Sequence, residues 1–223
     1  MDWDKTVIIN AAIGGWYPRG QRRLRRSLIE HGYHGEMMFW DKWPNDNFDK
    51  SCVYNVKAAA FEEAIAAGFT NILWIDCSGW VIADPTPIFQ QLDRDGYFIL
   101  QSGYNCAQVC SDACLGHFGI DRDKAETIND SSTITFGVRI GNPIADDFIA
   151  RWLNSAMEGA FHGNRVHDAA DSTDKRFLFH RQDQACASLA AYLSGVELTP
   201  FGGLCAYYEK QLPESVCLVY RGC

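Results

Sequence analysis

The sequence predicts a mixed α/β fold, with a mostly parallel central sheet flanked by helices, in one domain that spans residues 1–223. Short apolar, β-branched runs alternate with longer amphipathic stretches, which is typical of strands joined by crossover helices. One run, Ile72–Ile75, is continuously apolar, as expected for a strand buried on both faces. It stops abruptly at Asp76, in the sequence DCSG. Open α/β sheets bind their ligands at the carboxyl ends of such strands.

The composition excludes several classes of protein. A chain of 223 residues with 47% apolar and 22% charged residues can bury a substantial core. Its formal net charge of −8 argues against nucleic acid or an anionic membrane as the main partner. The N-terminal segment MDWDKTV lacks the regions of a signal peptide, and no stretch reaches the about 20 apolar residues of a membrane span. We therefore expect a cytoplasmic protein, and the sequence leaves open whether it forms a homodimer.

The nine cysteines do not form a recognisable framework. Their number is odd and no CxxC pair is present, which disfavours a disulfide scaffold. A continuous helix would place three of them and a histidine on one face, namely Cys106, Cys110, Cys114 and His117. About 12 Å of helix would then separate the first thiolate from the last, too far for both to bind one zinc ion. We interpret these cysteines as small buried or half-buried thiols.

The first expected strand, Val7–Ile9, runs into the small-residue loop AAIGG. Small residues let a ligand approach the backbone closely, as nucleotide-binding α/β folds require. The loop has no GxGxxG pattern, which disfavours a dinucleotide site. A helix is expected next, because Leu24 and Leu28 recur at helical spacing.

Five arginines lie within eight positions of this helix, which is unusual for an acidic protein. For Arg22, Arg25 and Arg26 we favour a solvated helix face. Arg19 and Arg23 lie nearer the preceding loop, so they are better placed to meet a diphosphate, which guanidinium groups bind in a bidentate manner.

Two segments lead from this helix to the central strand. Met37–Trp40 is expected to form a strand. Val53–Ala67 is an Ala-rich amphipathic stretch, which predicts a helix that ends at Gly68. Lys57 lies near the start of that helix.

The rest of the chain continues the alternation. Further strands are expected at 80–82, 97–100, 133–140, 197–199 and 216–220, and further helices at 84–92, 121–128, 143–157 and 184–193. Pro143 suits the first turn of its helix. The polar segment 101–130 is interpreted as a lid or an acceptor-side insertion, and 159–175 as a long functional loop.

The order of these motifs resembles one family. The small-residue loop, YPRG with RRL, NVKAAAFEEA, LWIDCSGWV, the helix that begins with Asp-Pro, and HRQDQ are similar to the small GT-A glycosyltransferase domains of large algal viruses, phages and some bacteria. The resemblance extends over roughly Val7 to Leu193, and WIDCS and HRQDQ are its most specific motifs. It implies the GT-A fold. It also implies transfer of a hexose or deoxyhexose from a UDP- or GDP-sugar to a glycan or another hydroxyl acceptor.

The resemblance also implies where the donor binds. The residues near the nucleotide would be Asn10, Ala11, Tyr17 and Arg23. Lys57 would approach the ribose or the phosphates. Asp76 and Ser78 would face the ribose and a divalent cation, Mn²⁺ or Mg²⁺.

The triplet DCS departs from the usual Asp-x-Asp pattern of this family. The hydroxyl of Ser78 is a weaker ligand for Mg²⁺ or Mn²⁺ than a carboxylate is. Metal binding is therefore expected to be weak, or to depend on substrate phosphates and on His180. A metal-independent enzyme that uses Arg19, Arg23 and Lys57 is the alternative. Taken alone, the triplet also fits an ordinary turn.

The HRQDQ segment holds the two candidate catalytic residues, Asp183 and His180. Breaking a sugar–phosphate bond puts positive charge on the anomeric carbon, and a carboxylate can stabilise that charge or accept the proton of the acceptor hydroxyl. Asp183 is our candidate for this carboxylate, and the N-cap of the helix 184–193 is its alternative role. His180 fits a buried histidine and a phosphate or metal contact equally well.

Glycosyl transfer from a nucleotide sugar is the function we expect, and two alternatives stay open. A sugar-phosphate nucleotidyltransferase has a related sheet, but its first loop normally carries a longer Gly-rich signature that ends in lysine, which GGWYPRGQRRL fits poorly. A catalytically silent module that binds nucleotide sugars is the other, because the serine of DCS weakens the metal site.

Overall fold

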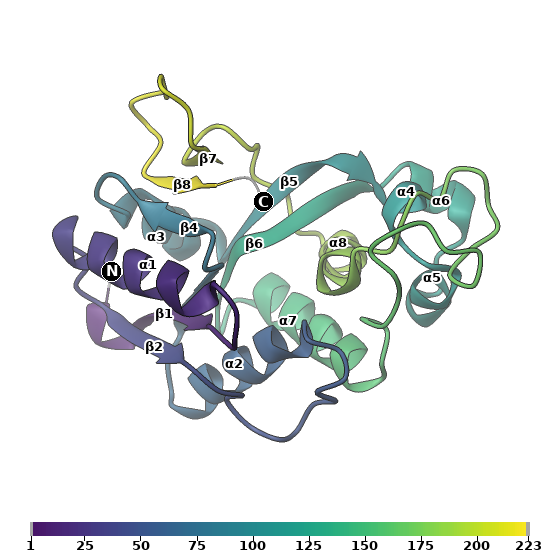
Figure 1. The fold of residues 1–223 in the computed structure, drawn as a ribbon, viewed down its shortest axis with the longest axis horizontal. Helices are drawn as coiled ribbons and strands as arrows, with labels where there is room; N and C mark the ends of the chain where they lie inside the picture. Colours follow the sequence, from purple (N-terminus) through teal and green to yellow (C-terminus); the bar gives the residue numbers. More distant parts are fainter. Residues whose placement is uncertain (1, 222–223) are drawn as a thin grey trace.

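A five-stranded sheet forms the centre of the computed structural model, which describes residues 2–221 (Figure 1). The strand order is β2-β1-β3-β6-β5. The strands are β1 (Thr6–Ala11), β2 (Glu36–Trp40), β3 (Asn71–Ile75), β5 (Tyr97–Asn105) and β6 (Asn129–Arg139). Because β6 is antiparallel to both β3 and β5, the other four strands share one direction. The predicted α/β fold with a mostly parallel sheet is confirmed.

Long helices cover both faces of this sheet. They are α1 (Tyr17–Glu30), α2 (Asn55–Ala66), α3 (Thr86–Asp95), α7 (Pro143–Met157) and α8 (Gln182–Ser194). Successive side chains of β1 point to opposite faces. Val7 and Ile9 pack in one core cluster with α2, α7 and α8, whereas Ile8 packs in a second cluster with α1 and α3. The alternation along one strand therefore builds two cores, one on each side of the sheet.

Three short helices occupy the connection from β5 to β6. They are α4 (Cys106–Val109), α5 (Asp112–Phe118) and α6 (Arg122–Glu126). A side chain caps the start of each one, from Asn105, Ser111 and Asp121 respectively. They gather at the end of the molecule opposite α1 and β2 (Figure 1). The expected helix 121–128 is thus shorter than predicted, and Cys106, Cys110 and Cys114 are buried thiols, as expected.

A second, three-stranded sheet lies beside α1, with the order β4 (Gly79–Val81), β8 (Leu218–Tyr220) and β7 (Cys205–Tyr207). The strand expected at 197–199 is wrong, because that segment meets β5 only through a single bridge between Leu100 and Thr199. The chain then turns away at Pro200 and supplies β7 instead, which the sequence did not predict. The segment 159–175 contains no helix or strand.

Candidate active site

The ammonium group of Lys57 is the centre of a buried charge cluster. It donates a hydrogen bond of 2.9 Å to the carbonyl oxygen of Thr133, and lies 2.9 Å from Oδ2 of Asp183 and 3.4 Å from Oδ1 of Asp76. Burial lowers the pKa of Lys57, but its attraction to the two carboxylates outweighs burial, so the pKa is raised above its ordinary value. Lys57 therefore stays charged. Its three N–H groups are matched to acceptors of the chain itself, rather than left for a phosphate.

Asp76 forms the partly open side of this cluster. It follows β3 directly, and its backbone N–H donates to the carbonyl oxygen of Ile134 at 2.8 Å. The indole Nε1 of Trp74 donates to Oδ1 of Asp76 at 2.6 Å, and the side chain of Asp76 is 28% exposed. Burial raises the pKa of Asp76, and Lys57 and Trp74 lower it by less. Trp74 and Lys57 thus both engage Oδ1, whereas Oδ2 has no hydrogen-bond partner among residues 2–221.

Asp183 is the buried side of the cluster. It lies in the first turn of α8, and its Oδ2 also accepts a hydrogen bond of 2.7 Å from the hydroxyl of Thr133. Its backbone carbonyl accepts one from Nε1 of Trp152 at 3.0 Å. The helix begins at Gln182, so the alternative that Asp183 is an N-cap is wrong. The second carboxylate oxygen, Oδ1, accepts no hydrogen bond within the described chain, which leaves it available to a ligand.

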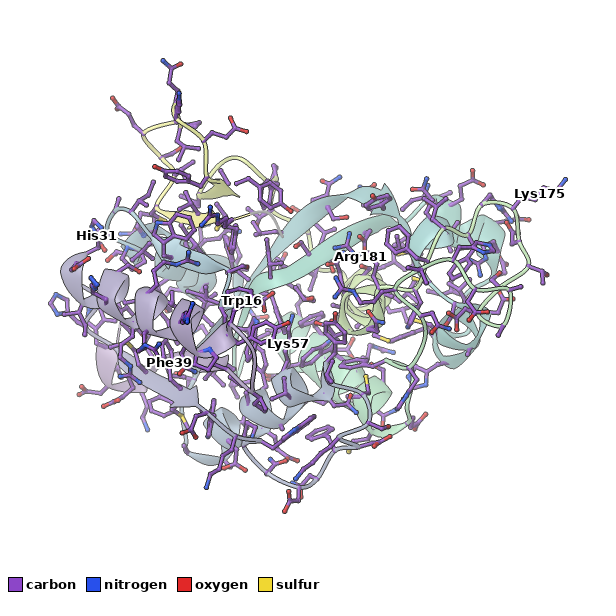
Figure 2. All side chains as sticks on the ribbon, in the orientation of Figure 1. Trp16, His31, Phe39, Lys57, Lys175 and Arg181 are labelled. Atoms are coloured by element: carbon purple, nitrogen blue, oxygen red, sulfur yellow. The ribbon has the colours of Figure 1, made fainter. Side chains whose placement is uncertain are left out.

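In the view of Figure 2, Lys57 lies near the middle of the molecule, between Trp16 at the start of α1 and Arg181 before α8. The residues of the β1–α1 loop approach this region from one side. Tyr17 stacks on Trp16 at 4.9 Å and is 46% exposed. Burial is the main cause that raises the pKa of Tyr54; the nearby charges of Arg165 and Lys57 lower it, and those of Asp183 and, least of all, Tyr17 raise it. Tyr17 is therefore an exposed residue that lies near Tyr54.

Asn10 has a structural position beneath the turn that follows β3. It is fully buried, and its Nδ2 donates to the carbonyl oxygen of Ile75 at 2.6 Å. Its Oδ1 accepts a hydrogen bond of 2.9 Å from Gln21. Ala11 follows at the end of β1 and is half-buried. Asn10 thus ties β1 to β3, and its side chain is occupied by the protein itself.

Arg23 and Gly20 hold α1 against the turn. Nη2 of Arg23 donates to the carbonyl oxygens of Cys77, at 3.2 Å, and Ser78, at 2.8 Å. Gly20 is buried, and a Cβ built on it would overlap the carbonyl oxygen of Cys77. Arg19 and Arg23 line a groove between α1 and β4, whose walls do not include Lys57, Asp76 or Asp183. The structure therefore does not bring these two arginines into the charge cluster.

His180 also lies apart from the cluster. It is fully buried, and its Nδ1 accepts a hydrogen bond of 3.2 Å from the backbone N–H of Ser111. Its Nε2 is buried without a hydrogen-bond partner in the described part of the chain. Gly163 packs so closely on the imidazole that a Cβ there would overlap it. His180 makes no hydrogen bond or ion pair with Lys57, Asp76 or Asp183.

The residues around Asp76 fit a resident divalent cation poorly. Within residues 2–221, no three His, Cys, Asp or Glu side chains lie together in a way that could hold a metal ion. Oδ1 of Asp76 is engaged by Trp74 and Lys57, and Ser78 contributes only a neutral hydroxyl. The cluster already contains a cation, the ammonium of Lys57.

Sequence reasoning missed two residues of this region. Thr133 contacts both Lys57 and Asp183, but a threonine in a β-branched run indicates only a strand. Asp130 is fully buried, and it accepts hydrogen bonds from Gln184 at 2.7 Å, from Ser188 at 2.8 Å and from Ser102. Asp130 thus anchors α8 to β6 beside Asp183. The sequence signal that could have led to Asp130 was the HRQDQ motif, because its last residue, Gln184, bonds to Asp130.

Comparison with known proteins identifies the fold. No protein family model and no curated protein matches the sequence. The apo structure of mouse xyloside xylosyltransferase 1 superposes with a TM-score of 0.54 at 9% identity, over 98% of each chain. A glycosyltransferase involved in the glycosylation of the major capsid of PBCV-1 superposes with a TM-score of 0.50 at 11% identity, over 96% of this chain and 92% of that one. The chain has a glycosyltransferase fold.

This glycosyltransferase fold confirms the GT-A architecture that the motifs implied, and it includes a viral neighbour of the expected kind. In such a fold the carboxyl ends of β1 and β3 form the ligand-binding edge. The cluster of Lys57, Asp76 and Asp183 lies there, since Asp76 directly follows β3. Among the described residues, every helix is too short or too polar to cross a lipid bilayer.

Proposed function

We propose that the protein transfers a sugar from a UDP- or GDP-sugar to a hydroxyl acceptor, with Asp76, Lys57 and Asp183 at the reaction centre. The observation that carries this proposal is that one buried ammonium joins two carboxylates at the ligand-binding edge of a glycosyltransferase fold. A buried ion pair of this kind is costly to form, so its presence at that edge favours a functional role over a purely structural one.

The chemistry assigns a different task to each carboxylate. Asp183 is shielded, and its Oδ1 is free to face a developing oxocarbenium-like carbon or to accept the proton of the acceptor hydroxyl. Asp76 is more exposed, so its Oδ2 is placed to accept hydrogen bonds from a ribose or from the sugar. Lys57 fixes the spacing between the two and places a positive charge beside both. Because its N–H groups are already used, we assign it a positioning role rather than contact with the diphosphate.

The departing diphosphate still needs a positive partner. We propose that a divalent cation, if one takes part, would be held mainly by the diphosphate, because the described chain alone offers too few ligands; Asp76 is the carboxylate that would face it. His180, fully buried against Ser111, is a less suitable partner for this cation than we expected from its motif.

The test is release of free UDP or GDP from a panel of nucleotide sugars, with and without Mn²⁺. The panel includes UDP-xylose, because a xylosyltransferase is among the structural neighbours, together with UDP-glucose, UDP-galactose, GDP-mannose and GDP-fucose. Turnover of one donor, lost in Asp183→Asn, is the expected result. Absence of turnover with every donor, with and without metal, would reject catalysis by this site.

A second candidate function is a module that binds a nucleotide sugar without turning it over. Ser78 in place of a carboxylate and the fully paired ammonium of Lys57 favour it. Calorimetric titration with UDP and GDP separates the two functions, since the module binds nucleotide but releases none from a donor.

A further inference from the structure

A stripe of four arginines lines a groove on the outer side of α1. Arg19, Arg22, Arg23 and Arg26 follow the spacing i, i+3, i+4, i+7, which places them on one face of the helix over about 10 Å. The groove has a volume of about 870 Å³, and its other wall is formed by β4 with Trp80 and the two residues after it. These arginines therefore surround a hollow rather than a convex surface. From the sequence we had favoured a solvated face for Arg22 and Arg26, and this groove is the reason to revise that interpretation.

The positive charge in the groove is poorly compensated. Arg19 and Arg22 form no ion pair with any residue between 2 and 221, and Arg26 has only a long contact of 4.0 Å with Glu30. The Nε atom of Arg23 is buried without a hydrogen-bond partner in the described chain. Burial and the nearby charge of Arg221 lower the pKa of Arg23. A protein with a net charge of −8 thus gathers four arginines around one groove, with Glu30 as the carboxylate among its lining residues, which is the electrostatic setting of an anion-binding site.

The guanidinium of Arg23 is also held in a fixed position. It lies 4.1 Å above the ring of Trp80, while its Nη2 bonds to the turn after β3. Tyr208 also contacts Trp80, with ring centroids 5.4 Å apart, and Tyr208 itself is 60% exposed. The ring of Trp80 beside the guanidinium groups offers two kinds of contact at once, one for the apolar face of a ring and one for anionic groups.

The groove extends along α1 from its first turn. Arg19 lies in the first turn of α1, directly after the β1–α1 loop, and the stripe runs from there toward the far end of the helix near His31 (Figures 1 and 2). A chain that enters the groove is therefore led away from the ligand-binding edge of the sheet. This is the arrangement needed by a long acceptor whose end reaches the reaction centre.

We propose that this α1–β4 groove binds the anionic groups of an acidic oligosaccharide, which is the acceptor chain for the sugar transfer. The role of this oligosaccharide as the acceptor rests on the proposed function, whereas its binding in the groove does not. Carboxylate and sulfate groups along a flexible chain match guanidinium groups spaced along a helix. A bilayer surface would not enter a groove between a helix and a strand.

The test is direct binding of two acidic probes, an oligogalacturonide and a heparin-derived oligosaccharide, against a neutral maltooligosaccharide of equal length. We expect the acidic probes to bind, with an affinity that falls as salt rises, and the neutral one to bind much more weakly. The double variant Arg22→Ala/Arg26→Ala should lose about tenfold in affinity, the effect of removing two partly exposed charge contacts. Arg25→Ala is the matched control, because Arg25 lies on the same helix but over the ring of Phe39, outside the groove.

Melting temperatures of the three proteins check that each is folded. Equal loss in the control and the double variant, or no salt-sensitive binding of either acidic probe, would overturn the proposal. Tighter binding of a single-stranded DNA or of phosphatidylserine vesicles than of both acidic sugars would overturn the assignment to a glycan. Titration of the unmodified protein with UDP and GDP tests the proposed function separately, since it does not involve the acidic probes.

Discussion

The ammonium of Lys57 lies 2.9 Å from Oδ2 of Asp183, and this ion pair joins the first turn of α2 to the first turn of α8. The side chains are only 8% and 3% exposed, so water does little to screen the attraction. The pair therefore fixes the position of Asp183 and places a positive charge beside it. It makes the geometry of the candidate site dependent on the packing of two helices that are distant in sequence.

Replacement of Lys57 by methionine should destabilise the fold strongly. Two carboxylates would be left without their shared cation, and breaking one partner of a buried pair typically costs about 3–5 kcal/mol. Urea denaturation of both proteins measures the free energy of unfolding. Lys50→Met is the control, because Lys50 pairs with Asp46 at the surface and should change stability by less than about 0.5 kcal/mol. A cost below about 1 kcal/mol for Lys57→Met would contradict the burial of this pair.

Replacement of Asp183 by asparagine should reduce donor turnover by about 10²–10⁴-fold, the usual contribution of a positioned acid or base. The amide keeps the size of the side chain but lacks its charge. The measurement is release of nucleotide from the preferred donor, alongside nucleotide affinity. Asp130→Asn is the matched control, because Asp130 is equally buried and holds the same helix through Gln184. An equal fall in both variants would mean that a displaced α8, rather than the lost carboxylate, causes the effect.

The dependence of stability on pH should report the burial of Asp130. Burial raises the pKa of Asp130 above its ordinary value of 3.8, and hydrogen bonds from Ser102 and Ser188 only partly oppose this. Between the ordinary and the raised pKa, the folded protein binds more protons than the unfolded chain does. The free energy of unfolding therefore falls as pH rises through this range. Asp130→Asn lacks this contribution, so the difference in stability between wild type and variant should shrink as pH rises. A difference that stays constant with pH would refute the raised pKa.

Replacement of Gly20 by alanine should push α1 away from the turn after β3. The added Cβ would meet the carbonyl oxygen of Cys77, which is backbone and cannot move aside easily. We expect a loss of about 1–3 kcal/mol, as for other overpacked sites. Gly116→Ala is the control, because Gly116 lies in α5 with open space around it and should gain stability from its higher helix propensity. Equal effects at both positions would show that close packing of α1 on the turn is not what Gly20 provides.

Sequence patterns were reliable where one local signal decided the structure. Pro143–Met157 forms α7 within the predicted bounds, because Asn142 caps it and Pro143 suits its first turn. The strand expected at 197–199 failed because the short stretch Glu-Leu-Thr says nothing about whether a neighbouring strand is within reach. β7 was missed because Cys-Ala-Tyr carries no strand pattern of its own.

The candidate site, too, was predictable only where a local motif marked a residue. Lys57, Asp76 and Asp183 were each identified from motifs, but their contact with one another was not predicted. A lysine in the first turn of a helix normally points to solvent, and only the tertiary packing of α2 on β6 buries it. Asp183 was weighed as an N-cap because the helix start could not be located to within one residue.

Thr133 lies 76 residues after Lys57 and 50 residues before Asp183, and it bonds to both. During synthesis Lys57 therefore emerges long before Asp183. Closing such long loops is entropically unfavourable until other contacts have formed. The cluster of Lys57, Asp76 and Asp183 cannot form in a partly made chain, so donor turnover that depends on Asp183 would itself be evidence that a molecule has folded through to α8.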